Sequence, residues 1–168
     1  MIRAADLVQY AMGCINPGGK QGGYIFGSHG QLCTLAVRED CAKNNPTQAP
    51  KILGDGARWD GHYVWDCSGI MRGAWRKLAT YKSGGATTIY DKWCSRKGPI
   101  DTMPDEPGTL VFRGTDKVKE HVGVYVGNGM VVDARGTDYG VLYGTLASYK
   151  AGWTHWAQPD DVDYSATT

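Results

Sequence analysis

The sequence lacks the features that would place it in several specialised classes. No run of apolar residues approaches the roughly 18–20 that a membrane-spanning helix needs. Basic and acidic residues number 18 and 17, and the formal net charge of +1 argues against nucleic-acid binding through bulk charge. Only seven prolines and an aromatic content of 11% argue against a disordered linker. We therefore expect a globular domain with neither a membrane span nor a nucleic-acid partner.

Cysteines are few and are not spaced for metal binding. No CxxC pair occurs, and no cluster of cysteine and histidine has the spacing of a zinc finger. We therefore expect no metal and no cofactor. The five cysteines are an odd number, so at least one thiol is unpaired within the chain. The simplest interpretation makes four of them buried free thiols: Cys14, Cys33, Cys41 and Cys94.

The N-terminus shows no secretory signal. Asp6 interrupts the stretch from Met1 to Val8, which therefore has no continuous apolar h-region. The expectation is a protein made in the cytoplasm that reaches any site outside it by another route.

Glycine, in contrast, is abundant. The chain has 24 glycines in 168 residues, about twice the usual share of ~7%, and they lack the three-residue period of collagen. A chain of this length fits one domain and can bury about two-thirds of its unfolded surface. We expect a loop-rich domain that acts as a monomer.

Helical patterns occupy the first half of the chain. Residues 3–12 and 66–81 repeat apolar residues at helical spacing, and the second helix is expected to turn Arg72 away from its apolar face. Between them, residues 33–60 are polar and irregular, with a candidate helix over 33–43, and residues 28–60 are interpreted as an insertion.

Strand patterns follow after residue 101. The expected strands cover 108–112, 121–126, 130–134, 141–144 and 153–157. Gly127-Asn128-Gly129 predicts a tight hairpin between the second and third of them. Helices followed by a meander indicate an α+β domain over 1–158, with N-terminal helices on a central antiparallel sheet. Residues 159–168 are expected to form a frayed tail.

One cysteine stands where a helix is expected to begin. Asp66-Cys67-Ser68-Gly69 opens the helix predicted over 66–81, and Asp66 suits its N-cap. The partial positive charge of a helix N-terminus lowers the pKa of a thiol below its free value of ~8.5. Cys67 is therefore a candidate nucleophile.

A histidine and an acid flank the predicted hairpin. If the strands pair symmetrically about Asn128, His121 faces Arg135, and Asp133 becomes a diagonal neighbour of His121. An acid in that place can orient an imidazole that serves as general base to a nucleophile. The candidate catalytic residues are thus Cys67, His121 and Asp133.

These motifs resemble the NlpC/P60 peptidases of bacterial cell walls. The resemblance rests on Asp66-Cys67-Ser68-Gly69, on residues 121–129 (HVGVYVGNG), on 107–112 (PGTLVF) and on 23–27 (GYIFG). It implies a papain-like α+β fold and a cysteine endopeptidase of peptidoglycan stem peptides, often at the D-γ-glutamyl–diamino acid bond. Cys67 would be the nucleophile, His121 the base, and Asp133 would replace the histidine common at the third position.

The resemblance also suggests residues that bind the stem peptide. Tyr24 and Asp66 match positions that contact its free amine or line the oxyanion site, although core packing and helix capping explain them as well. Ser68 and Trp65 adjoin the cysteine. Arg135 suits a substrate carboxylate or a surface ion pair.

Other interpretations stay open at this point. His155 is a second candidate for the third position. The insertion at 28–60 and the missing signal are more typical of phage or prophage members, which would act at the cell wall after release or within a virion, with phage tail or lysis proteins as partners. An N-acetylmuramoyl-L-alanine amidase on the same scaffold, or a largely structural tail or baseplate component, are the alternatives to a peptidase.

Overall fold

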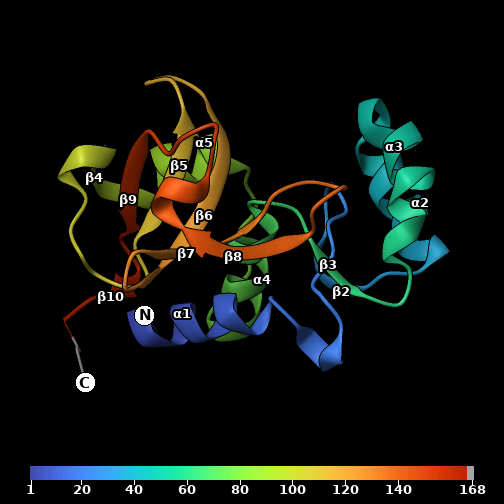
Figure 1. The fold of residues 1–168 in the computed structure, drawn as a ribbon, viewed down its shortest axis with the longest axis horizontal. Coiled ribbons are helices and arrows are strands. Elements are labelled where there is room, and N and C mark those ends of the chain that lie inside the picture. The colour runs from blue at the N-terminus through green and yellow to red at the C-terminus, as the bar shows by residue number, and fades with distance from the viewer. Residues whose placement is uncertain (166–168) are drawn as a thin grey trace.

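The computed structural model describes residues 1–165 as helices beside a twisted sheet (Figure 1). The helices are α1 (Ala4–Gly13), α2 (Leu35–Asn44), α3 (Ala49–Leu53), α4 (Gly69–Leu78) and α5 (Ala86–Thr88), with shorter turns at Pro17–Gly19, Pro46–Gln48, Asp55–Trp59, Ile89–Trp93, Ile100–Thr102 and Leu146–Ser148. The strands are β1 (Ile2–Arg3), β2 (His29–Leu32), β3 (Tyr63–Trp65), β4 (Cys94–Pro99), β5 (Leu110–Gly114), β6 (Lys119–Gly127), β7 (Met130–Ala134), β8 (Val141–Thr145), β9 (His155–Pro159) and β10 (Val162–Asp163).

The main sheet is antiparallel and has six strands in the order β4-β9-β5-β6-β7-β8. The predicted strands all occur, so the α+β class is confirmed. The edge strand β4 was not expected, because its sequence, CSRKGP, has no alternating apolar pattern. A polar strand that ends in proline suits an edge, where one side makes no ladder hydrogen bonds.

The β6–β7 hairpin has the predicted register. Val124 pairs with Val132 and Tyr125 with Val131, symmetrically about Asn128. Asn128 has a φ of 54° and Gly129 a φ of 74°, the left-handed conformation that a tight hairpin turn requires. This register determines which side chains of the two strands share a face.

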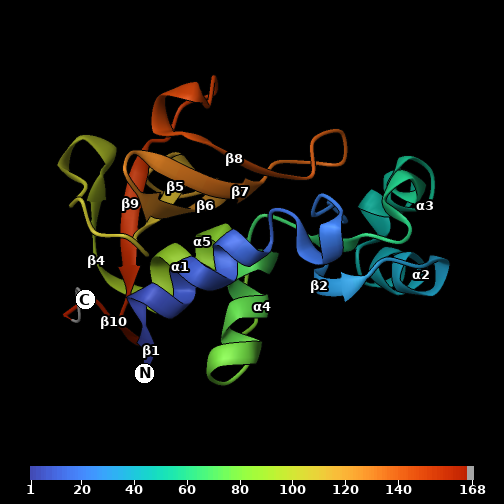
Figure 2. The same cartoon turned by 60° about the horizontal axis from the view of Figure 1, so that its bottom comes forward.

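Helices α1 and α4 lie beside the sheet, and their apolar faces form the main core with it (Figure 2). Leu7 of α1, Trp75 of α4 and Phe112 of β5 are fully buried there. Burial of apolar surface is the main force that holds these layers together. The expectation for Arg72 was wrong: its side chain is buried, because it faces a carboxylate inside the protein.

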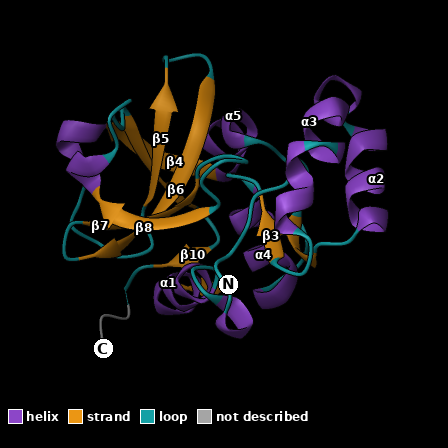
Figure 3. Ribbon diagram, turned by 45° about the vertical axis from the view of Figure 1, so that its right-hand side comes forward, coloured by secondary structure: helices purple, strands orange, loops and turns teal. Residues whose placement is uncertain are grey.

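Residues 28–60 are more ordered than predicted. They contain β2, α2 and α3, so the expectation of an irregular stretch was wrong, whereas the helix predicted over 33–43 occurs as α2. Figure 3 shows α2 and α3 together, on the side away from the main sheet. A second hydrophobic cluster lies under them and includes Cys41, Ile52 and Trp59. This segment therefore has a small core of its own.

The chain end is also better anchored than expected. β10 pairs in parallel with β1, so that Ile2 aligns with Val162, and the Tyr164 hydroxyl donates to the Gly108 carbonyl at 2.8 Å. Residues 159–165 are therefore packed rather than frayed, and the rest of the predicted tail, 166–168, lies outside the described residues. Within residues 1–165, no helix is both long and apolar enough to cross a membrane.

Candidate active site

Cys67 lies in the turn between β3 and α4. The helix begins at Gly69, three residues after the predicted start at 66, so Cys67 precedes the first helical turn. Its side chain is partly buried and packs against the main core. The backbone N–H of Val122, the residue after His121, favours the thiolate form of Cys67.

The pKa of Cys67 moves in the direction opposite to the one predicted. Burial raises it to about 12, and the neighbouring carboxylate of Asp66 adds to the rise. The N–H groups of Ser68 and Val122 and the charge of Arg72 oppose the rise without cancelling it. The thiol is therefore protonated at neutral pH, and a nucleophilic role requires a base that removes its proton.

The carboxylate of Asp66 connects the turn that contains Cys67 to neighbouring backbone through hydrogen bonds. Its Oδ1 accepts from the N–H of Gly69 at 2.7 Å, and its Oδ2 accepts from the N–H of Gly27 at 2.6 Å. The N-cap position itself is Ser68, whose side chain caps nothing, so the expectation of Asp66 as the N-cap was wrong in position although it binds a helix N–H. Arg72 donates to the same Oδ1 at 3.1 Å.

His121 and Asp133 meet across β6 and β7 as the register predicted. The Nε2 atom of His121 lies 2.8 Å from Oδ2 of Asp133, whose side chain is fully buried. Among the described residues, Nδ1 of His121 has no hydrogen-bond partner. A carboxylate on Nε2 favours the tautomer in which Nδ1 is unprotonated and able to accept a proton.

Two aromatic rings that sequence reasoning missed cover this histidine. Trp153 stacks on the imidazole with ring centroids 5.3 Å apart and 15° between the planes, and Tyr149 lies 5.5 Å away at 48°. Both belong to the segment before β9, far from His121 in the chain. Gly123 makes room for them, since a Cβ there would come within 3.1 Å of the Trp153 ring. That glycine, two residues after the histidine, was the available signal.

The other residues predicted to bind substrate differ in how near they lie to Cys67. The pKa of Tyr24 is raised by burial and by the nearby Cys67 and Asp66, so its hydroxyl lies close to the nucleophile and stays protonated. Ser68 is buried and accepts from Arg72 at 2.5 Å. Trp65 is buried on another side, where its Nε1 donates to the Tyr10 hydroxyl at 3.1 Å. Their substrate roles stay predictions.

The Arg135 side chain is directed at the carboxylate of Asp133. Its Nε donates to Oδ2 of Asp133 at 3.0 Å and its Nη2 to Oδ1 at 2.9 Å. The alternative candidate for the third position, His155, is engaged elsewhere: its Nε2 lies 3.0 Å from Asp116 and its Nδ1 lies 2.7 Å from Thr154. Asp133 therefore occupies the place beside the base.

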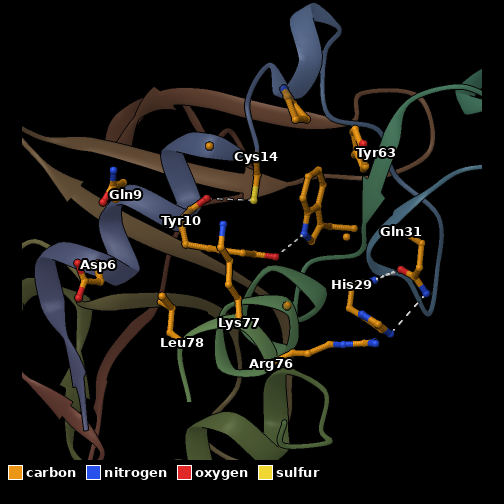
Figure 4. A pocket seen from close by; sticks show the side chains of 15 residues that line it. Asp6, Gln9, Tyr10, Cys14, His29, Gln31, Tyr63, Arg76, Lys77 and Leu78 are labelled. Carbon is orange, nitrogen blue, oxygen red and sulfur yellow. Dashed lines mark hydrogen bonds between the residues drawn. The ribbon is translucent and has the colours of Figure 1, made fainter. Parts of the chain in front are cut away.

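One sizeable cavity lies apart from these residues. It measures about 920 Å³ and is lined by residues that include Tyr10 of α1, Cys14 directly after α1, Trp65 of β3, and Arg76 and Lys77 of α4 (Figure 4). The triad residues do not line it. A smaller cavity of about 140 Å³ borders Tyr24, where α3 of the 28–60 segment faces the turn at 136–137.

Comparisons with known proteins agree with this arrangement. The sequence model of the NlpC/P60 family matches residues 54–158, more than half of the chain. Over 110 residues the chain is 33% identical to the probable endopeptidase p60 of Listeria innocua and 32% identical to that of Listeria monocytogenes. These alignments cover 63% of this chain but 21% of each relative, so the chain spans about a fifth of their length.

Solved structures show the same fold. The NlpC/p60 domain of the peptidoglycan hydrolase SagA aligns with a TM-score of 0.58 at 17% identity, over 94% of this chain and 99% of that one. The P60 domain of antigen MAP1204 from M. avium subspecies paratuberculosis aligns with a TM-score of 0.56 at 22% identity, over 93% and 96%. The fold is thus papain-like, of the kind that these domains share. The chain belongs to the NlpC/P60 family.

Proposed function

We propose that this chain is a cysteine peptidase that cleaves amide bonds in the stem peptides of peptidoglycan. The observation that carries the proposal is the hydrogen bond of 2.8 Å between His121 and Asp133 beside the turn of Cys67, within a region that matches the NlpC/P60 family. The names of relatives supply the substrate class: an endopeptidase in Listeria and a peptidoglycan hydrolase in SagA.

The proposed reaction begins with proton transfer. His121 takes the proton of the Cys67 thiol on Nδ1 as the sulfur attacks the carbonyl carbon, because burial keeps the free thiol protonated. Backbone N–H groups at the start of α4, with that of Cys67, stabilise the oxyanion. The imidazolium then protonates the leaving amine, which leaves a thioester, and a water activated by His121 hydrolyses it.

The position of Tyr24 supports a binding site for one end of the substrate. Its protonated hydroxyl is a donor near the nucleophile, and the cavity of about 140 Å³ beside it is open to one face of α3. We propose that the stem peptide lies here, with the D-γ-glutamyl–diamino acid bond at Cys67. A phage origin and action at the cell wall from outside the cytoplasm stay predictions.

The test uses purified sacculi and mass spectrometry of the released fragments. Cys67→Ala removes the nucleophile and is expected to abolish release, whereas Cys41→Ala, which changes a buried thiol in the second cluster, is expected to retain it. Undiminished release by Cys67→Ala contradicts the proposal. Fragments cut within the stem peptide support a peptidase, while intact stem peptides freed from the sugar would identify an amidase instead.

The third member of the triad has its own measurement. Asp133→Asn keeps the size of the side chain but loses the charge that orients His121, and general acid–base groups contribute roughly 100-fold or more to rate. We expect acylation to slow by at least that order while the thermal transition persists. An acylation rate equal to that of the native chain would make Asp133 a bystander.

A further inference from the structure

The Asp133 carboxylate is shared between a base and a permanent cation. Oδ2 lies 2.8 Å from Nε2 of His121 and accepts from Nε of Arg135 at 3.0 Å, while Oδ1 accepts from Nη2 of Arg135 at 2.9 Å. Asp133 is fully buried, and the Arg135 side chain is 22% exposed. A buried carboxylate needs such a counter-charge, and the two-point contact of a guanidinium also sets its orientation.

The same guanidinium contacts the aromatic cover of the histidine. The Cζ atom of Arg135 lies 4.7 Å from the ring centroid of Tyr149. Tyr149 in turn packs on His121 and on Trp153, with ring centroids 5.5 Å and 4.5 Å away. One side chain therefore contacts both the acid at the edge of the imidazole and a ring on its face.

We propose that Arg135 is a positioning residue for His121, acting through Asp133 and Tyr149, and not a ligand for a substrate carboxylate. The proposal rests on the proposed function of the site. By supplying the counter-charge, Arg135 keeps Asp133 an acceptor for Nε2–H, so that Nδ1 remains the nitrogen that takes the thiol proton. The fork formed by Nε and Nη2 is committed to Asp133, so the buried acid fixes the orientation of the guanidinium in the absence of any substrate.

The other charges around His121 are already matched. On β5 its cross-strand partner is Arg113, whose Nη2 lies 2.8 Å from Glu120 and whose Nε donates to the Tyr149 hydroxyl at 3.1 Å. The thiol of Cys67, which faces the backbone of Val122 next to His121, is held protonated by burial, which raises its pKa. Removal of Arg135 therefore leaves the buried Asp133 carboxylate without its counter-charge beside His121.

The first test compares Arg135→Gln with Arg135→Lys on a soluble stem-peptide substrate. We expect the glutamine variant to lose roughly tenfold or more in kcat with KM within about threefold, and the acid limb of its pH–rate profile to move to higher pH. Arg135→Lys restores the positive charge but not the two-point contact with Asp133. The acid limb of its pH–rate profile should therefore return to the native position, while kcat recovers only in part. Arg58→Gln, which breaks an exposed pair with Asp138, is the matched control.

The kinetic outcomes separate three roles. A rise in KM at unchanged kcat would make Arg135 a substrate ligand and overturn the proposal. Unchanged kcat, KM and pH profile would make it a surface pair and overturn it as well. Loss of stability without a change in the acid limb would reduce the role to a structural one.

A second measurement needs no substrate. Nitrogen NMR of the imidazole in the native chain is expected to show His121 as the Nε2–H tautomer, and Arg135→Gln is expected to increase the share of Nδ1–H. An Nδ1–H tautomer in the native chain, or no change in the variant, overturns the proposal. Since this readout does not depend on turnover, it stays valid if the peptidase assignment itself fails, and it also serves if the glutamine variant is poorly active.

Discussion

Arg72 and Asp66 form an ion pair beneath the turn that carries Cys67, with Nη2 and Oδ1 3.1 Å apart and both side chains at most one-tenth exposed. Arg72 also donates to the Ser28 carbonyl at 3.1 Å, and Asp66 accepts from Gly27. The pair thereby joins the segment after Tyr24 to the start of α4. The position of the nucleophile depends on this buried contact.

Asp66→Asn tests that dependence. The variant leaves the Arg72 guanidinium buried without a counter-charge, and breaking one side of a buried pair costs about 3–5 kcal/mol. We expect a loss of that order in the free energy of unfolding, measured by urea denaturation. Asp138→Asn is the control, because its pair with Arg58 is exposed and contributes less than about 1 kcal/mol. Equal losses in the two variants would show that burial of the pair is unimportant.

Gly69→Ala tests the close approach of two backbone segments under the same turn. A Cβ at this position would lie 2.0 Å from the Ser28 carbonyl oxygen, so the turn must move. We expect a loss of about 1–3 kcal/mol in stability together with reduced turnover. Gly13→Ala, at the end of α1, has nothing within 4 Å of the new methyl and should be neutral or slightly stabilising. A fully active Gly69→Ala would mean that the turn tolerates displacement.

Alkaline pH should destabilise the fold. Burial raises the pKa of Cys41 to about 11 and the pKa values of Cys94 and Tyr10 to about 12. The unfolded chain releases these protons near ~8.5 for thiols and ~10 for phenols, so it binds fewer protons than the native state above those values. Stability is therefore complete below about pH 8.5 and falls by up to roughly 1.4 kcal/mol per pH unit for each group.

Urea denaturation under reducing conditions from neutral to strongly alkaline pH measures this decline. Cys94→Ala should show a shallower decline than the native chain, since one of the buried thiols is gone. A midpoint that stays constant as the pH rises past the phenol range would contradict the expected linkage.

Local patterns in the sequence were sufficient for five of the six strands of the main sheet and for the pairing of His121 with Asp133. The Gly-Asn-Gly turn determines the register of β6 and β7, and the register alone brings Asp133 to His121. Apart from the glycine at position 123, no local pattern indicates that Tyr149 and Trp153 cover the histidine, because their positions depend on how β9 joins the sheet between β4 and β5.

The error over Cys67 has a different physical origin. Helix position predicts a lowered pKa, but the thiol sits before the helix, against the core and next to the Asp66 carboxylate, and burial dominates. The prediction for Arg72 was wrong for a related reason: a charged residue on a helix is expected to face water unless its buried partner is known. Both cases depend on contacts between segments that only the folded chain brings together.

The separate hydrophobic cluster under α2 and α3 has a consequence for how the molecule opens. Because Cys41, Ile52 and Trp59 pack in a cluster separate from the main core, we expect α2 and α3 to open locally without the main sheet. The links of this cluster to the sheet side include the Trp59 indole, which donates to the Thr137 carbonyl at 2.7 Å. The wall of the small cavity beside Tyr24 includes Ile52 of this cluster. We therefore expect that wall to move without any rearrangement of the strands that carry His121 and Asp133.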